Sequence, residues 1–141
     1  MDLENKLKAY YATAILGVVF AVIGFTYNAW RLVVSEDNTN IRTAAFAVLN
    51  ELAELEQTIY SAHYDQDNVN GSPRKGWVKV GLIVDLSMLM GDSVEQSAVA
   101  LKANWTENWQ SVAQDRATTN ELIEKIDDVR SEIKSQLTML D

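Results

Sequence analysis

The feature that most constrains this chain is an apolar stretch near its amino terminus, residues 10–34. It reads YYATAILGVVFAVIGFTYNAWRLVV, and no charged side chain occurs from Ala12 to Ala29. A helix rises ~1.5 Å per residue, so about 20 residues cover the ~30 Å hydrocarbon core of a bilayer. We therefore predict one transmembrane helix over residues 10–34, preceded by a short tail over residues 1–9.

Aromatic residues bracket this stretch. Tyr10 and Tyr11 lie at one end, and Tyr27 and Trp30 lie near the other. Rings with a polar tip favour the boundary between lipid headgroups and hydrocarbon, so these positions agree with a membrane span. The competing interpretation is a cleaved signal peptide, although the apolar run is longer than the apolar region of a typical signal.

Small residues recur on one face of the predicted span, which we call the small-residue face. Its members are Ala14, Gly17, Ala21 and Gly24, followed by Asn28. Lipid does not drive helices together, so such a face favours association by letting two backbones approach and pack. Self-association is one interpretation; the other is that Gly and Ala are simply common in membrane helices.

Basic residues beside the span predict its orientation. Lys6, Lys8 and the free amine precede it, while Arg31 and Arg42 follow it. Because Lys and Arg favour the cytoplasmic side, this difference of one charge leans toward an amino terminus inside and the rest of the chain outside. We expect a single-pass protein of a bacterial-type inner (plasma) membrane.

The remainder of the chain is acidic and lacks cysteine. Residues 35–141 carry nine Lys and Arg against eighteen Asp and Glu, a net charge of −9. Such a surface repels phosphate backbones, so a nucleic-acid polymer is not an expected partner. The absence of Cys from the whole chain excludes disulfides, thiolate metal sites and cysteine nucleophiles.

A polar segment and a regular apolar stripe follow the span. Residues 35–40, SEDNTN, form a polar hinge that could begin a new helix or lie within a continuous one. Beyond it, apolar residues recur at alternating spacings of four and three, which predicts a helix over residues 40–66. The stripe consists of Ile41, Ala45, Val48, Leu52, Leu55, Ile59 and Ala62.

The next segments predict a loop and a second helix. Residues 67–75 contain the only Pro and several turn-forming residues, so we expect a loop distant from the membrane. Residues 77–90, WVKVGLIVDLSMLM, are too short to span a bilayer. A buried strand would lack a partner strand, so we predict a helix and expect it to be the most buried element.

Two further helices are predicted over residues 93–114 and 118–140. Each start carries a polar residue followed three positions later by Glu, the spacing of a capping box. These pairs are Asp92 with Glu95 and Thr118 with Glu121. The apolar faces are Val94, Ala98, Leu101, Trp105, Trp109 and Val112, then Leu122, Ile126, Val129, Ile133, Leu137 and Leu140.

These elements predict an all-α fold with one N-terminal transmembrane helix followed by an antiparallel four-helix bundle over residues 41–141. Amphipathic helices joined by short loops bury their apolar faces most simply in such a bundle. We expect Trp77, Trp105 and Trp109 to contribute large buried surfaces to its core.

Arg74 and Lys75 are the candidate ligand-binding residues. They precede the helix predicted over residues 77–90, where cations oppose the helix dipole. Two cations beside free backbone N–H groups suit a small anion or a nucleotide phosphate. The alternative is that they are solubilising charges in a turn, with Arg74 paired to Asp65 or Asp67.

Two other polar positions, His63 and Asp85, are candidates for chemistry. His63 and Asp67 would share a helix face, but a metal site needs three or four ligands, so we predict no metal there. Asp85 lies among apolar residues, so we expect it to be buried either in an ion pair or as a functional acid. Its predicted ion-pair partners are Arg42, Lys79 or Lys102.

The layout of tail, span, hinge and heptad helix resembles the first half of bacterial chemoreceptor sensor modules. The resemblance is one of layout without a shared motif, and those modules return to the membrane through a second span, which residues 35–141 do not supply. We therefore carry over no signalling function from it.

The sequence contains no motif for a catalytic site or a cofactor. We expect a non-enzymatic, membrane-anchored bundle that self-associates and acts with protein partners as a subunit, scaffold or adaptor of a membrane assembly. The alternative is a membrane-anchored sensor or effector that binds a small anion or nucleotide at the loop before residue 77.

Overall fold

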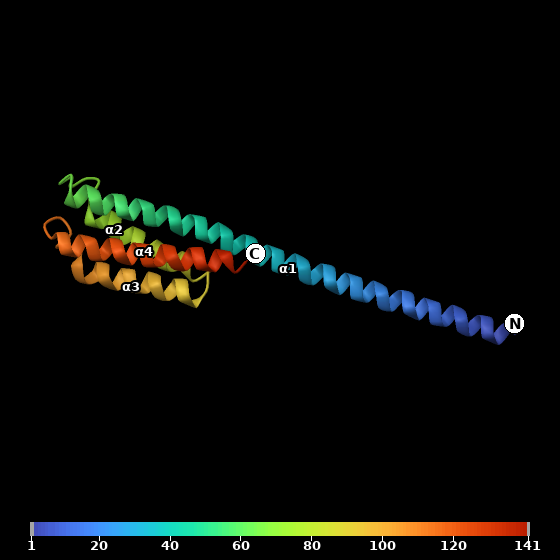
Figure 1. Ribbon diagram of the computed structural model, residues 1–141. Helices are drawn as coiled ribbons and strands as arrows, with labels where there is room; N and C mark the ends of the chain where they lie inside the picture. Colours follow the sequence, from blue (N-terminus) through green and yellow to red (C-terminus); the bar gives the residue numbers. More distant parts are fainter. Residues whose placement is uncertain (1, 141) are drawn as a thin grey trace. The chain divides into compact units, whose positions relative to one another are not determined.

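The computed structural model describes residues 2–140, which form four α-helices (Figure 1). No β-strand occurs in residues 2–140, so the predicted all-α fold class is confirmed. The helices are α1 (Leu3–His63), α2 (Pro73–Ser87), α3 (Asp92–Asn108) and α4 (Arg116–Thr138).

Helix α1 is much longer than the helix predicted over residues 40–66. The polar segment 35–40 lies inside it, so of the two alternatives that the sequence left open the continuous helix is correct. Residues 35–40 include neither Pro nor Gly, so every residue there retains a backbone N–H and ordinary helix propensity. The chain divides into two units, Met1–Asn38 and Thr39–Asp141, which we call the N-terminal and C-terminal units.

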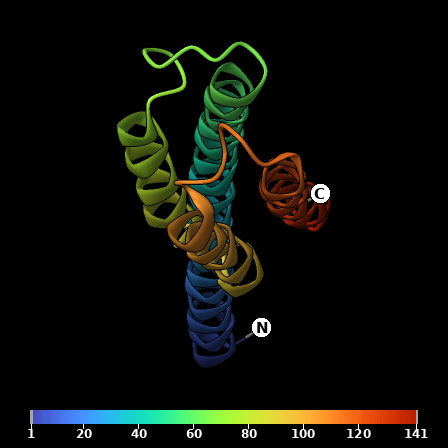
Figure 2. The same cartoon turned by 90° about the vertical axis from the view of Figure 1, so that its left-hand side faces the viewer.

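The C-terminal unit is a helical bundle in which successive helices run in opposite directions (Figure 1). Figure 2 shows its four helices arranged around one core. Each helix contacts the next in chain order, and α4 returns to α1, so the apolar faces are enclosed. The contacts include Glu51 with Lys79, Trp77 with Trp105, Asn104 with Glu121, and Arg130 with Glu56.

The core contains the apolar stripes that the sequence predicted. In α1, Ala45, Val48, Leu52, Leu55 and Ile59 are fully buried, and residues at the two ends of the stripe pack against them. A spacing of four and three keeps side chains on one face of a helix, which explains why one stripe fills one side of a bundle. Buried members of the other stripes are Val94, Ala98, Leu101, Trp105, Val112, Leu122, Ile126, Val129 and Ile133.

The prediction that the second helix would be the most buried element is wrong. Helix α2 buries one face, which consists of Gly76, Val80, Ile83 and Ser87. On another face Val78 is 70% exposed. Apolar residues occur on nearly every side of α2, so its composition does not show which side is buried. In a four-helix bundle only one side of each helix faces the core.

The predicted capping boxes are also wrong. Helix α4 is capped by Asp115, whose carboxylate accepts bonds from the Ala117 backbone N–H (3.1 Å) and the Thr118 hydroxyl (2.6 Å). Glu121 instead accepts a bond from the Asn104 side chain of α3 (2.7 Å). Helix α3 starts after Gly91, whose φ of 109° is the left-handed conformation that glycine adopts without strain. Asp92 therefore lies in the first turn of α3.

Candidate functional site

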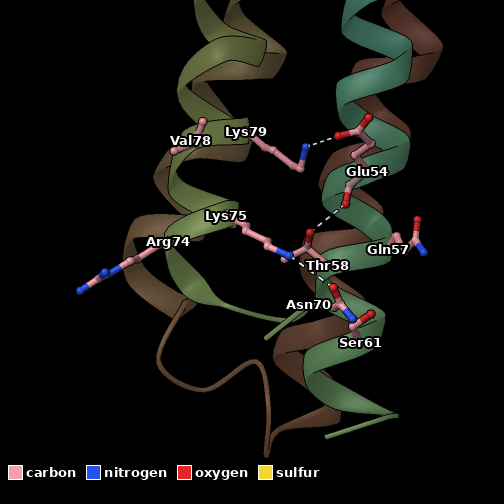
Figure 3. Close-up of a pocket in the computed structure, with 9 residues that line it drawn as sticks. All are labelled: Glu54, Gln57, Thr58, Ser61, Asn70, Arg74, Lys75, Val78 and Lys79. Carbon is pink, nitrogen blue, oxygen red and sulfur yellow. Dashed lines mark hydrogen bonds and ion pairs between the residues drawn. The ribbon is translucent and has the colours of Figure 1, made fainter. Parts of the chain in front are cut away.

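An open groove of about 740 Å³ separates the end of α1 from the beginning of α2 (Figure 3). Asn70 of the predicted loop and the two cations that the sequence singled out, Arg74 and Lys75, are among the residues that line it. The lining residues are Glu54, Gln57, Thr58, Ser61, Asn70, Arg74, Lys75, Val78 and Lys79.

The loop that closes one end of the groove is held by Asp67. Its carboxylate accepts bonds from the backbone N–H groups of Val69 (2.8 Å) and Asn70 (3.0 Å) and from the Asn70 side chain (2.8 Å). These hydrogen bonds, those of the Asn70 backbone first, lower the pKa of Asp67 below its usual value. Gly71 follows, and a Cβ there would lie 2.4 Å from the Ala62 backbone nitrogen, so only glycine lets the loop return along α1.

Lys79 joins α2 to α1 across the groove. Its ammonium lies 3.3 Å from a Glu51 carboxylate oxygen and also pairs with Glu54. Burial acts to lower the pKa of Lys79, but the hydrogen bonds to Glu54 and Glu51 outweigh it and the pKa is raised. The hydrogen bond from Lys79 lowers the pKa of Glu54. The charge of Lys79 is therefore used in holding the two helices together.

The two predicted ligand-binding cations take different directions. Figure 3 shows Lys75 and Lys79 extending toward α1, whereas Arg74 points away from it. The Lys75 ammonium donates to the Asn70 side-chain oxygen at 3.4 Å, a long hydrogen bond. Both residues line the groove, but only Lys75 extends across it toward α1, so Lys75 is the cation of this pair that a small anion between the helices would meet.

His63 lies at the end of α1, where its Nδ1 is 2.9 Å from the carbonyl oxygen of Val112. This contact ties α1 to the segment between α3 and α4, while the Asp67 carboxylate is directed to its own loop. Within residues 2–140, His, Cys, Asp and Glu form no group of three or more that could hold a metal ion.

The expectation that Asp85 is buried is wrong. Asp85 is exposed on α2 and forms no ion pair in the described part of the chain, residues 2–140. Lys79, one of its expected partners, lies on another side of the same helix and binds α1 instead. Asp85 was misjudged because its sequence neighbours are apolar, although several of them are themselves exposed.

A tryptophan cluster packs α2 against α3. Trp105 is 2% exposed, and Trp77 meets it and Trp109 edge to face with ring centroids 6.4 Å apart in both pairs. A Cβ on Gly76 would lie 2.1 Å from Trp105 Cζ2, so the backbone of α2 rests directly on this ring. The sequence predicted the three tryptophans as core residues; Trp105 is buried, whereas Trp77 and Trp109 are half-buried and pack against the core. The requirement for Gly76 depends on contacts between helices, which the sequence does not show.

The N-terminal unit presents a different kind of surface. Every residue from Asp2 to Asp37 is exposed, including the small-residue face of Ala14, Gly17, Ala21, Gly24 and Asn28. A Cβ added at Gly17 or Gly24 would meet nothing within 4 Å. Helix α1 is long and apolar enough in this region to cross a membrane, which makes it a candidate span by length and composition.

Comparison with known proteins gave no relative. No protein-family model matches the chain, and neither a curated protein nor a solved structure matches it.

Proposed function

We propose that this chain is a non-enzymatic, single-pass membrane protein whose helical bundle serves as a self-associating subunit, scaffold or adaptor of a membrane assembly. One observation carries the proposal, which is the exposure of the apolar side chains between residues 10 and 34. Tyr10 is 75% exposed, Phe20 67% and Phe25 76%. Continuous apolar surface of this size needs an apolar environment from outside the chain, and its length matches the hydrocarbon core of a bilayer.

The membrane in this proposal is a bacterial-type inner (plasma) membrane. The amino terminus lies inside and the bundle outside, because Lys6, Lys8 and the free amine precede the span and two arginines follow it. Self-association uses the small-residue face, where Gly17 and Gly24 leave open space for a second helix. The bundle would then be the part that binds protein partners.

The ion pairs of the bundle support a non-enzymatic role. Lys79 is paired with Glu51 and Glu54, and Arg130 is paired with Glu56 and Asp127. These pairs connect helices or brace a helix surface, so Lys79 and Glu54, two of the charged residues that line the groove, serve packing.

Membrane fractionation tests the proposal. The full chain should sediment with membranes and resist extraction by alkaline carbonate. Val19→Arg places a charge in the apolar stretch and should shift the chain toward the soluble fraction, because a central Arg costs roughly 2.5–3.5 kcal/mol on insertion scales. Val99→Arg is the matched control, since Val19 is 48% exposed and Val99 on α3 is 49% exposed. Carbonate extraction of the unaltered chain would contradict the proposal.

A second candidate function is a membrane-anchored sensor that binds a small anion or nucleotide. It is favoured by the 740 Å³ groove and by Lys75, which reaches into it. Adding inorganic phosphate or ATP to the full chain in detergent should then raise its unfolding temperature. Lys75→Glu should abolish that rise and Lys102→Glu on α3 should keep it; no rise in the unaltered chain would remove this candidate.

A further inference from the structure

A second cavity, which we call the tryptophan cavity, lies in the C-terminal unit and shares only Thr58 with the groove beside Lys75. Its volume is about 290 Å³. Residues of α1, of the loop before α2, of α3 and of the segment between α3 and α4 line it. Most of its lining is apolar, including Ile59, Pro73, Trp105, Trp109 and Val112. Small-molecule sites in proteins are commonly of this kind, with apolar walls and a few polar groups.

Hydrogen bonds hold the wall of the tryptophan cavity that follows α3. The Val112 carbonyl oxygen accepts bonds from His63 Nδ1 (2.9 Å) and from the Thr119 hydroxyl (3.0 Å). The Ala113 carbonyl oxygen accepts a bond from the Gln66 side chain (3.0 Å). These bonds connect the segment before α4 to the end of α1 and to the first turns of α4. The cavity is therefore formed by the chain itself, which lowers the cost of ordering it around a ligand.

The indole N–H of Trp105 is a buried donor without an acceptor. Trp105 lines the cavity and is 2% exposed, and no group within residues 2–140 accepts a hydrogen bond from its Nε1. Its ring is held in place because Trp77 meets it edge to face and the backbone of Gly76 rests on it. Buried N–H groups in proteins are nearly always paired, since an unpaired one costs free energy. A molecule in the cavity that carries an acceptor would pair this group.

The lining also defines the charge and size of such a molecule. Within residues 2–140, no Asp, Glu, Lys, Arg or His lines the cavity, and its polar side chains are Thr58, Asn68 and Gln110. A charged ligand would lose its hydration there without gaining a partner of opposite charge. A cavity of ~150 Å³ holds benzene. The volume of about 290 Å³ is therefore suited to two fused rings.

We infer that the tryptophan cavity binds a neutral molecule of two fused aromatic rings with a carbonyl oxygen, which accepts a hydrogen bond from Trp105 Nε1. The rings pack against Trp109 and Pro73, which supply flat apolar surface. This ligand differs in charge from the anion considered for the groove beside Lys75. The site lies in the C-terminal unit, so it goes beyond the proposed membrane function and does not depend on it.

Nuclear magnetic resonance of the full, ¹⁵N-labelled chain in detergent tests the site with coumarin, a neutral two-ring molecule with one carbonyl oxygen. The chain has four Trp, so its indole N–H signals can be assigned by single Trp→Phe substitutions. Coumarin should move the Trp105 N–H signal downfield, because its carbonyl oxygen accepts the hydrogen bond. Naphthalene has two rings and no acceptor, so it should not move this signal downfield.

Two substitutions separate the hydrogen bond from the space. Trp105→Phe removes the donor and should weaken coumarin binding about tenfold, read from the Trp109 N–H signal. Ala113→Leu fills part of the cavity without altering Trp105 and should weaken binding by at least about tenfold. Ala117→Leu is the matched control, since Ala117 is exposed on the first turn of α4 and should leave binding unchanged. Coumarin dissolved in the detergent would act on both leucine variants equally.

Three results would overturn the inference. The first is a Trp105 N–H signal that lies downfield without coumarin and is not moved by it, which would make an ordered water the only acceptor. The second is a signal that naphthalene moves downfield as coumarin does. The third is equal coumarin binding by the Ala113→Leu and Ala117→Leu variants. Membrane fractionation is read out separately, so loss of this site and loss of the membrane function are distinguishable.

Discussion

The two parts of α1 place apolar residues in opposite surroundings. In the C-terminal unit, apolar residues at spacings of four and three are buried, and Leu52 is 0% exposed. In the N-terminal unit, apolar residues lie all round the helix, and Leu16 is 54% exposed. In the C-terminal unit, the other helices of the chain cover the apolar side chains of α1. In the N-terminal unit, residues 2–140 leave the apolar side chains uncovered, and this difference is the basis of the proposed membrane span.

The largest expected effect distinguishes two tryptophans. Trp105→Ala should lower the free energy of unfolding of the bundle by roughly 3–5 kcal/mol, because it removes a buried ring and leaves a cavity. Trp30→Ala should change it little, since Trp30 is 61% exposed in the N-terminal unit. Thermal unfolding in detergent, followed by near-ultraviolet circular dichroism, measures both. Equal losses for the two variants would contradict the separation of the units.

Two leucines of α1 provide a comparison within one helix. Leu52→Ala should cost roughly 2–4 kcal/mol of bundle stability, since the side chain is fully buried among apolar neighbours. Leu16→Ala should leave the bundle unchanged, because it alters only the N-terminal unit. Urea titration of each variant gives the difference. A destabilising Leu16→Ala would show that the two units unfold together.

Two glycines differ in the space around them. Gly76→Ala should destabilise the bundle by roughly 1–3 kcal/mol, because the added methyl group collides with Trp105 and forces the helices apart. Gly17→Ala has open space and should have no effect on the bundle. The same unfolding measurement applies. A stabilising Gly76→Ala would mean that α2 can move away from Trp105 at no cost.

The smallest expected effect depends on pH. The hydrogen bonds from Thr118 and the Ala117 backbone lower the pKa of Asp115 below its usual 3.8. The unfolded chain therefore binds this proton first, so the stability that Asp115 contributes is complete above pH 3.8 and is lost as pH falls through the folded-state pKa. Asp115→Ala should lower the unfolding temperature at neutral pH, and the difference from the unaltered chain should vanish in strong acid. A difference that is constant with pH would contradict this cap.

The sequence predicted the core well where side chains repeat with the helical period. The sequence predicts the stripe from Ala45 to Ile59 and the stripe of α4 because apolar residues at alternating spacings of four and three indicate one buried face of a helix. Helix α2 was misjudged because WVKVGLIVDLSMLM has apolar residues on every side, and the period therefore does not identify the buried face. The same cause explains why Asp85 was expected to be buried and why Lys79 was expected among its ion-pair partners.

The sequence did not predict the ion pairs between residues that are far apart in the chain. Arg130 reaches Glu56 and Lys79 reaches Glu51 because the bundle places their helices together, and no local pattern names these partners. The sequence predicts the start of α4 at Thr118, whereas the helix is capped by Asp115, three residues earlier, which has the same capping chemistry. The continuity of α1 could not be decided, since residues such as Ser35 and Asn40 are compatible with both a cap and a helix interior.

Cysteine accessibility tests the central claim, that residues 10–34 lie in a membrane. Single cysteines are placed at Val19 and at Ser72 in this Cys-free chain, and cells expressing each variant are labelled with a membrane-impermeant maleimide before and after lysis without detergent. The account predicts that position 72 is labelled in intact cells and that position 19 stays unlabelled until detergent dissolves the membrane. Labelling at position 19 in the absence of detergent would contradict a membrane span.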